Sequence, residues 1–162
     1  PQSRQSYLSA ADEALELTRE LFARVGTVRS IRLHGDCHPS NILWTPAGPH
    51  FVDLDDCRMG PAIQDLWMLL SGDRRERTIQ LSDILAGYSE FHDFNPAEIA
   101  LIEGLRTLRI LYYSAWLARR WDDPAFPRNF PWFGNPRYWD DQIETLREQC
   151  DQLREPPLKA GW

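Results

Sequence analysis

The chain has 162 residues, of which 43% are hydrophobic and 26% are charged. These values exclude a disordered or collagen-like chain and fit one globular domain. Because the net charge of −6 comes without any run of basic residues, we expect neither nucleic acid nor an anionic membrane surface as a partner.

The spacing of apolar and turn residues predicts a mainly helical α+β fold with one small strand region. Ser9 is the predicted N-cap of a first helix, which should end at Val25 because Gly26 follows it. The hairpin that we expect next has a turn rich in proline and glycine. In chain order, the further elements are a strand at Val28–Leu33, hairpin strands at Ile42–Trp44 and His50–Leu54, and helices at Ile63–Leu70, Thr78–Phe91, Asn95–Trp121 and Tyr138–Arg154.

The helix that starts after Asn95 carries the clearest start signal in the chain. Asn95 is a good N-cap, Pro96 occupies the first helical position, and Glu98 has the spacing that closes a capping box.

Cysteine usage and the length of apolar stretches bear on the compartment. The three cysteines are an odd number without a C-x-x-C spacing, which favours a reducing compartment over a disulfide framework or a structural zinc site. The best apolar stretch, Ile110–Ala118, is shorter than the roughly 20 residues of a membrane helix. We expect a cytoplasmic protein.

Polar residues suited to chemistry concentrate between positions 34 and 65. Residues 34–41 read HGDCHPSN and residues 51–56 read FVDLDD. On a bent loop, Asp36 can accept a proton from a hydroxyl, while Asn41 and Asp53 offer a neutral and a charged oxygen ligand. Such hard oxygen donors suit Mg²⁺, and their spacing is that of phosphoryl-transfer enzymes, in which Mg²⁺ holds the phosphates of ATP.

These two segments resemble the catalytic and metal-binding loops of the aminoglycoside phosphotransferase and choline kinase superfamily. Further stretches are similar to a narrower family of bacterial stress-response kinases, reported as serine/threonine protein kinases. The resemblance covers nearly the whole chain and implies one domain, residues 1–162, which is the C-terminal catalytic lobe of a protein-kinase-like fold. A small β-hairpin region would carry its catalytic loop. The stretches that carry the narrower resemblance are Phe51–Arg58, Gly60–Gly72, Asp123–Trp132 and Glu155–Leu158.

The resemblance also implies roles for single residues. Asp36 matches the catalytic base that takes the proton of the acceptor hydroxyl. Asn41 and Asp53 match the ligands of Mg²⁺, which binds together with ATP, and Asp53 takes part in catalysis through that metal.

Three more residues receive supporting roles from the same resemblance, and two others receive them more loosely. His34 and His38 would brace the loop by hydrogen bonds. Asp65 matches an aspartate that accepts hydrogen bonds from the backbone of the catalytic loop. Asp55 and Asp56 are weaker candidates for contact with a second metal ion or the substrate.

The chain departs from a complete kinase in several ways. It has no G-x-G-x-x-G motif, no A-P-E motif, and a single lysine, Lys159, near its end. The elements that cover and neutralise the phosphates of ATP are therefore absent. The chain begins with Pro1, and we expect a fragment that lacks its N-terminal lobe, which would be its partner in the same protein. Alone, the fragment should be inactive.

The sequence thus predicts the catalytic lobe of an ATP- and Mg²⁺-dependent phosphotransferase that acts on serine or threonine hydroxyls of proteins. A kinase for small hydroxyl compounds is an alternative, because both types share the loop. A second alternative is a metal-dependent hydrolase that uses His34, Asp36, His38 and Asp53 as ligands. A third is a non-catalytic, pseudokinase-like module.

Overall fold

The computed structural model describes residues 2–161, most of which are helical, with two small sheets. The chain forms two compact units. The first contains the described residues up to Arg24 together with Glu103–Pro156, and the second contains Val25–Ile102 and the described residues from Pro157 onward. The expectation of a mainly helical α+β fold is confirmed.

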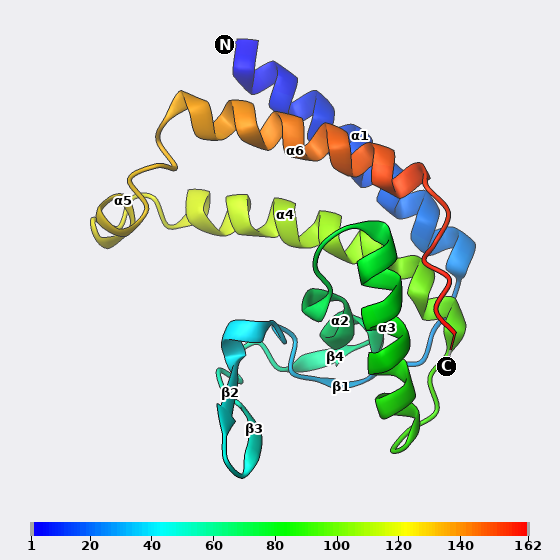
Figure 1. Ribbon diagram of the computed structural model, residues 1–162. Helices are drawn as coiled ribbons and strands as arrows, with labels where there is room; N and C mark the ends of the chain where they lie inside the picture. Colours follow the sequence, from blue (N-terminus) through cyan, green and yellow to red (C-terminus); the bar gives the residue numbers. More distant parts are fainter. Residues whose placement is uncertain (1, 162) are drawn as a thin grey trace. The chain divides into compact units, whose positions relative to one another are not determined.

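Helices make up the first unit: α1 (Gln2–Val25), most of α4 (Ile102–Arg119), α5 (Ala125–Asn129) and α6 (Pro136–Arg154), all labelled in Figure 1.

Helix α1 starts earlier than predicted but ends where expected. Ser9 lies inside the helix, so the prediction of an N-cap there is wrong. No glycine or proline occurs between residues 2 and 8 to end the helix, and Tyr7 packs edge-on against Trp139 of α6. At the other end, Gly26 has a φ of 73°, the left-handed conformation in which glycine ends a helix after Val25.

Small side chains let α1 approach α4 and α6 closely. Ala10, Ala11 and Ala14 are buried against Leu146 and Cys150 of α6, and the two helices lie side by side in Figure 1. Where α1 meets α4, the small residue is Gly104 of α4. A Cβ at this position would lie 2.8 Å from the Phe22 ring. The core of this unit therefore depends on close helix packing.

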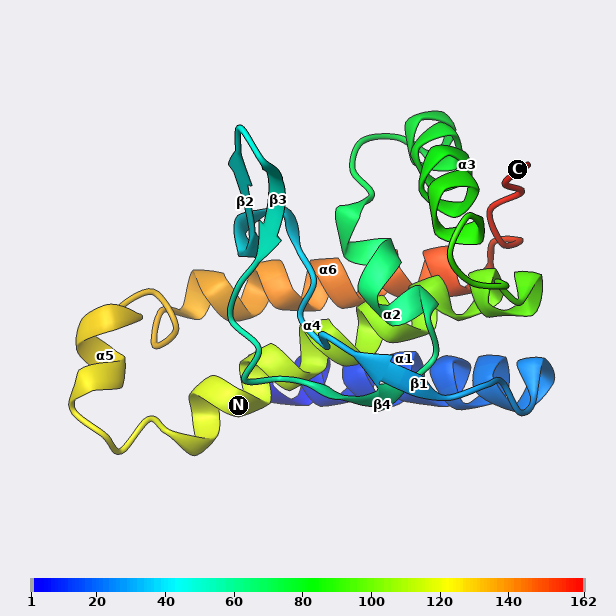
Figure 2. The same ribbon diagram turned by 90° about the horizontal axis from the view of Figure 1, so that it is seen from below.

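The second unit contains two separate antiparallel sheets of two strands each, visible in Figure 2. Strand β1 (Ile31–Leu33) pairs with β4 (Arg58–Gly60). Strand β2 (Ile42–Thr45) pairs with β3 (Gly48–Phe51), which confirms the predicted hairpin. Strand β4 is not among the predicted strands, because three residues are too few to show an alternating pattern.

The helical segments of this unit are η1 (Pro39–Asn41), α2 (Ile63–Leu66), η2 (Trp67–Leu69), α3 (Arg74–Ser89) and η3 (Pro96–Leu101). The three segments labelled η are 3₁₀ helices. Helix α3 begins four residues before the predicted Thr78, because Asp73 and Glu76 form a reciprocal capping box. That first turn is entirely charged, so the apolar pattern did not reveal it.

Near η3, two of the three predicted start signals are confirmed. The Asn95 side chain accepts a hydrogen bond from the backbone N–H of Ala97 at 3.1 Å, and Pro96 begins the segment. The predicted capping-box role of Glu98 is wrong, because its carboxylate is buried and accepts a hydrogen bond from the distant Ile63 instead.

Within residues 2–161, no helix has the combination of length and apolar character that crossing a bilayer requires.

Candidate active site

The loop 34–41 follows β1 and leads through η1 into the hairpin. Its bend starts at Gly35, whose φ of 89° favours glycine. The backbone then closes two turns: His38 N–H donates to the Asp36 carbonyl at 3.0 Å, and Asn41 N–H donates to the His38 carbonyl at 2.9 Å. Pro39 begins η1, where its missing N–H costs nothing. The loop therefore has a defined backbone conformation.

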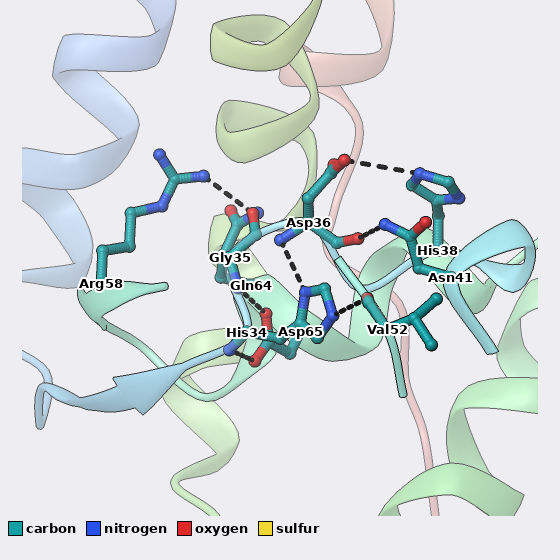
Figure 3. A network of polar contacts seen from close by, with 9 residues as sticks. All are labelled: His34, Gly35, Asp36, His38, Asn41, Val52, Arg58, Gln64 and Asp65. Carbon is teal, nitrogen blue, oxygen red and sulfur yellow. Dashed lines mark hydrogen bonds and ion pairs between the residues drawn. The ribbon is translucent and has the colours of Figure 1, made fainter. Parts of the chain in front are cut away.

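Asp65 of α2 holds the start of this loop. One carboxylate oxygen accepts the backbone N–H of His34 at 2.6 Å, and the other accepts that of Gly35 at 2.8 Å (Figure 3). Hydrogen bonds to a charged group contribute about 1.5–3 kcal/mol each. The contacts are those that the family resemblance implies for Asp65, although its role in activity stays a prediction.

The Gly35 carbonyl accepts hydrogen bonds from two side chains that are not among the predicted site residues. Arg58 of β4 donates to this oxygen at 2.8 Å, and Gln64 donates at 3.4 Å. In addition, a Cβ on Gly35 would lie 2.1 Å from the Asp56 carbonyl oxygen. No sequence motif marks Arg58 for this contact, because it arises from the pairing of β4 with β1.

We expect Gly35→Ala to lower the free energy of unfolding by at least about 3 kcal/mol, since it combines a positive φ with a backbone clash. Gly26→Ala is the matched control: Gly26 also has a positive φ, but a Cβ there would meet nothing within 4 Å. It should cost about 1 kcal/mol. Thermal and denaturant unfolding followed by circular dichroism measures both, and equal losses in the two variants would contradict the role of the Asp56 contact.

The two loop histidines brace the backbone and the side chain of Asp36. The His34 ring accepts the Asp36 N–H at Nδ1 (3.4 Å), so Nε2 carries the proton and donates to the Val52 carbonyl at 2.8 Å. His38 Nε2 lies 3.4 Å from the Asp36 carboxylate (Figure 3). These positions suit the predicted bracing roles.

Asn41 links the loop to the strand that precedes Asp53. Its side chain is buried and donates from Nδ2 to the Asp36 carbonyl at 3.0 Å, and its own carbonyl accepts the Val52 N–H at 3.0 Å. Among the described residues, Asn41 Oδ1 accepts no hydrogen bond. The network therefore orients the amide and leaves its oxygen available as a ligand.

Asp53 has the only positive φ of any non-glycine residue in the described part of the chain, at 63°. This left-handed conformation is strained for a residue with a side chain, although aspartate tolerates it better than most. Such strain is concentrated at functional sites. Asp53 follows directly after Val52, which is hydrogen-bonded to both His34 and Asn41. Its role as a metal ligand stays a prediction.

Asp55 and Asp56 lie in a turn that the Cys57 N–H closes by donating to the Leu54 carbonyl at 3.2 Å. Both side chains are exposed. The backbone carbonyl of Asp56 approaches the loop closely at Gly35. Contact of either carboxylate with a second metal ion or a substrate stays a prediction.

Cys37, directly after Asp36, is unsuited to act as a nucleophile. Burial, followed by the nearby Asp65 and Asp36 carboxylates, raises the pKa of its thiol to about 11. A thiol with this pKa is protonated at neutral pH, and the thiolate is the reactive form. Cys37, Cys57 and Cys150 are all free thiols.

The hydrolase alternative is not supported by this geometry. Both ring nitrogens of His34 are engaged with backbone groups, so neither is free to bind a metal. Within the described residues, no three side chains of the His, Cys, Asp and Glu types are grouped so that they could hold a metal ion together. The proposed set of two histidines and two aspartates is therefore wrong as a metal centre.

Comparison with known proteins identifies the family. The sequence model of the phosphotransferase enzyme family matches residues 2–102, which contain the whole loop and hairpin. The chain belongs to this phosphotransferase family. Stress response kinase A of Escherichia coli K12 is 54% identical over 154 residues. The serine/threonine protein kinase RdoA of Salmonella typhimurium and the stress response kinase A of Shigella flexneri are each 53% identical over the same length.

These matches extend over 95% of this chain but only 46% of each relative. The chain therefore spans about half the length of the curated relatives that it matches. The predicted resemblance to stress-response kinases is confirmed.

Proposed function

We propose that this chain is the catalytic C-terminal lobe of an ATP- and Mg²⁺-dependent phosphotransferase that transfers phosphate to serine or threonine hydroxyls of proteins. The observation that carries the proposal is the hydrogen-bond network of the loop 34–41. Asp65 fixes the start of the loop, while Asn41 and Val52 connect its end to Asp53. A loop held in this way presents three oxygen-bearing side chains from one bend and the strand behind it.

The residues fit a magnesium ion. The amide oxygen of Asn41 accepts no hydrogen bond within the described part of the chain, and Asp53 is exposed at the end of the hairpin. Mg²⁺ binds through one or two carboxylates and completes its shell with water and phosphate oxygens. Asn41 Oδ1 and the Asp53 carboxylate would be the protein ligands. When bound, the metal would neutralise the charge that develops on the phosphates.

Asp36 would act on the acceptor. Its side chain is only 21% exposed and faces His38, which limits its rotation. In the proposed reaction its carboxylate accepts a hydrogen bond from the acceptor hydroxyl. It takes the proton as the new oxygen–phosphorus bond forms and the bond from the γ-phosphorus to the bridging oxygen breaks, so that ADP leaves. The transition state of phosphoryl transfer is loose, so most of this contribution comes from orienting the hydroxyl.

The rest of the relatives' length would supply what this chain lacks. The sole lysine lies near the end of the chain and no glycine-rich loop occurs, so we assign the phosphate-covering elements to a further lobe of the same polypeptide. The acceptor class rests on the relative that is named a serine/threonine protein kinase. Three free thiols suit a reducing compartment such as the cytoplasm.

The experiment is a transfer assay with γ-labelled ATP on the full-length protein that contains this chain. Protein acceptors and small hydroxyl compounds are supplied side by side, with and without Mg²⁺. We expect Mg²⁺-dependent label on serine or threonine residues. Label on the small compounds alone would move the protein to the small-molecule kinases, and a lack of transfer to every acceptor would contradict a catalytic role and favour the pseudokinase-like alternative.

A further inference from the structure

A buried carboxylate lies outside the loop and is not explained by the proposed reaction. Glu98 belongs to η3 and is 3% exposed. Its Oε2 accepts the backbone N–H of Ile63 at 3.1 Å. A buried carboxylate is costly unless hydrogen bonds compensate for the lost water. Here the compensating donor comes from the start of α2.

Helix α2 needs an acceptor at this end because its own sequence provides none. Its N-cap is Ala62, which has no polar side chain, and no side-chain cap is present. Ile63 is completely buried, so water cannot satisfy its N–H. Unpaired buried N–H groups are strongly unfavourable. Glu98 lies 35 residues further along the chain and accepts the hydrogen bond that a local N-cap side chain usually accepts.

The same turn of α2 carries Asp65. Its backbone N–H donates to the Ala62 carbonyl at 3.2 Å, and this carbonyl belongs to the same peptide group as the Ile63 N–H that Glu98 accepts. A continuous path then leads from Glu98 through this peptide group and Asp65 to the backbone of His34 and Gly35.

We propose that Glu98 is a positioning residue for the active site, which holds the first turn of α2 so that the Asp65 carboxylate meets the backbone of the loop 34–41. The assignment rests on the proposed function for its kinetic consequence, but the structural link can be tested without activity. Burial raises the pKa of the Glu98 carboxyl, and its interaction with the backbone at the start of α2 acts in the opposite direction.

The test compares Glu98→Met and Glu98→Gln in the full-length protein. Methionine has a similar length without an acceptor, whereas glutamine keeps an acceptor oxygen. Amide hydrogen exchange followed by mass spectrometry should show exchange about tenfold faster or more at Ile63, His34 and Gly35 in Glu98→Met. Leu81 and Leu85, buried in α3, should keep their protection, which a general loss of stability would not allow.

The kinetic readout separates positioning from nucleotide binding. In Glu98→Met, kcat should fall by about ten- to a hundredfold because the loop is misplaced, while KM for ATP changes by less than about threefold. Glu98→Gln should restore both kcat and exchange to near the wild-type values. Glu90→Met, at an exposed position after α3, is the matched control and should leave both unchanged.

Outcomes that overturn the proposal are distinct from a failure of the proposed function. If His34 and Gly35 exchange at wild-type rates in Glu98→Met, Glu98 does not position the loop, whatever the activity. If Glu98→Gln behaves like Glu98→Met, the accepted hydrogen bond is not the cause. Should Glu98→Met fail to fold, Glu98→Asp withdraws the acceptor by one methylene and should shift exchange in the same direction. Wild-type protein without phosphoryl transfer would contradict the enzyme proposal alone, because exchange still decides the role of Glu98.

Discussion

Replacing Asp36 with asparagine should lower kcat for phosphoryl transfer by about 10²–10⁴-fold in the full-length protein, the range that a general base contributes. Asparagine has nearly the same shape but cannot take the proton of the acceptor hydroxyl. The loop should keep its conformation, because the contacts to the His34 ring, the Asn41 amide and the His38 N–H use the backbone N–H and carbonyl of residue 36. The His38 ring faces the side chain of residue 36, and asparagine keeps an oxygen for that contact. Steady-state kinetics with saturating ATP and Mg²⁺ measures the effect.

Two controls make the result for Asp36→Asn interpretable. Asp83→Asn alters an exposed aspartate of α3 and should leave kcat unchanged. Unfolding of Asp36→Asn should follow that of the wild type, since no backbone contact is removed. Turnover at the wild-type rate in a folded Asp36→Asn protein would exclude Asp36 as the base.

The second large effect is expected for Asp65→Ala. This change removes both acceptors of the loop backbone and leaves the N–H groups of His34 and Gly35 unpaired. Two hydrogen bonds to a carboxylate together correspond to about 3–6 kcal/mol, so we expect a clear loss of unfolding free energy or a locally unfolded loop. Denaturant unfolding measures the first, and hydrogen exchange at His34 and Gly35 measures the second.

Activity should fall with Asp65→Ala even under conditions where the protein stays folded, because a misplaced loop no longer orients the reacting groups. Asp65→Asn should be intermediate, since the amide keeps one acceptor oxygen and turns a donor toward the second N–H. Asp83→Ala provides the exposed control. Unchanged exchange at His34 and Gly35 in Asp65→Ala would show that the loop holds its shape without this carboxylate.

The sequence predicts the elements that are determined by neighbouring residues, such as a turn or a helix-ending glycine. The hairpin followed from its proline- and glycine-rich turn, and the end of α1 followed from Gly26. The start of α1 was missed because its position depends on Tyr7 packing against Trp139 of α6. The short strand β4 exists through its pairing with β1, and neither contact leaves a pattern in neighbouring residues.

The candidate site also combines residues that a local motif reveals with residues that only tertiary contacts reveal. Asp36, Asn41 and Asp53 could be singled out because their types and spacing suit chemistry, and their roles stay predictions. Arg58 and Glu98 contact backbone groups far away in the sequence, and such contacts leave no local pattern. The capping-box prediction for Glu98 failed because tertiary burial outweighed a local bond of modest strength. The strained φ of Asp53 is a further property that only the structure reveals, and it marks the residue that the motif had already singled out.

The proposed function requires that Asn41 and Asp53 hold a divalent ion beside Asp36. The decisive measurement is anomalous scattering from Mn²⁺ in crystals of the full-length protein with a non-hydrolysable ATP analogue. We predict a metal peak within about 2.3 Å of Asn41 Oδ1 and of an Asp53 carboxylate oxygen, with the Asp36 carboxylate facing the terminal phosphate. A metal–nucleotide complex held by other residues, with Asn41 and Asp53 turned away from it, would contradict this proposal.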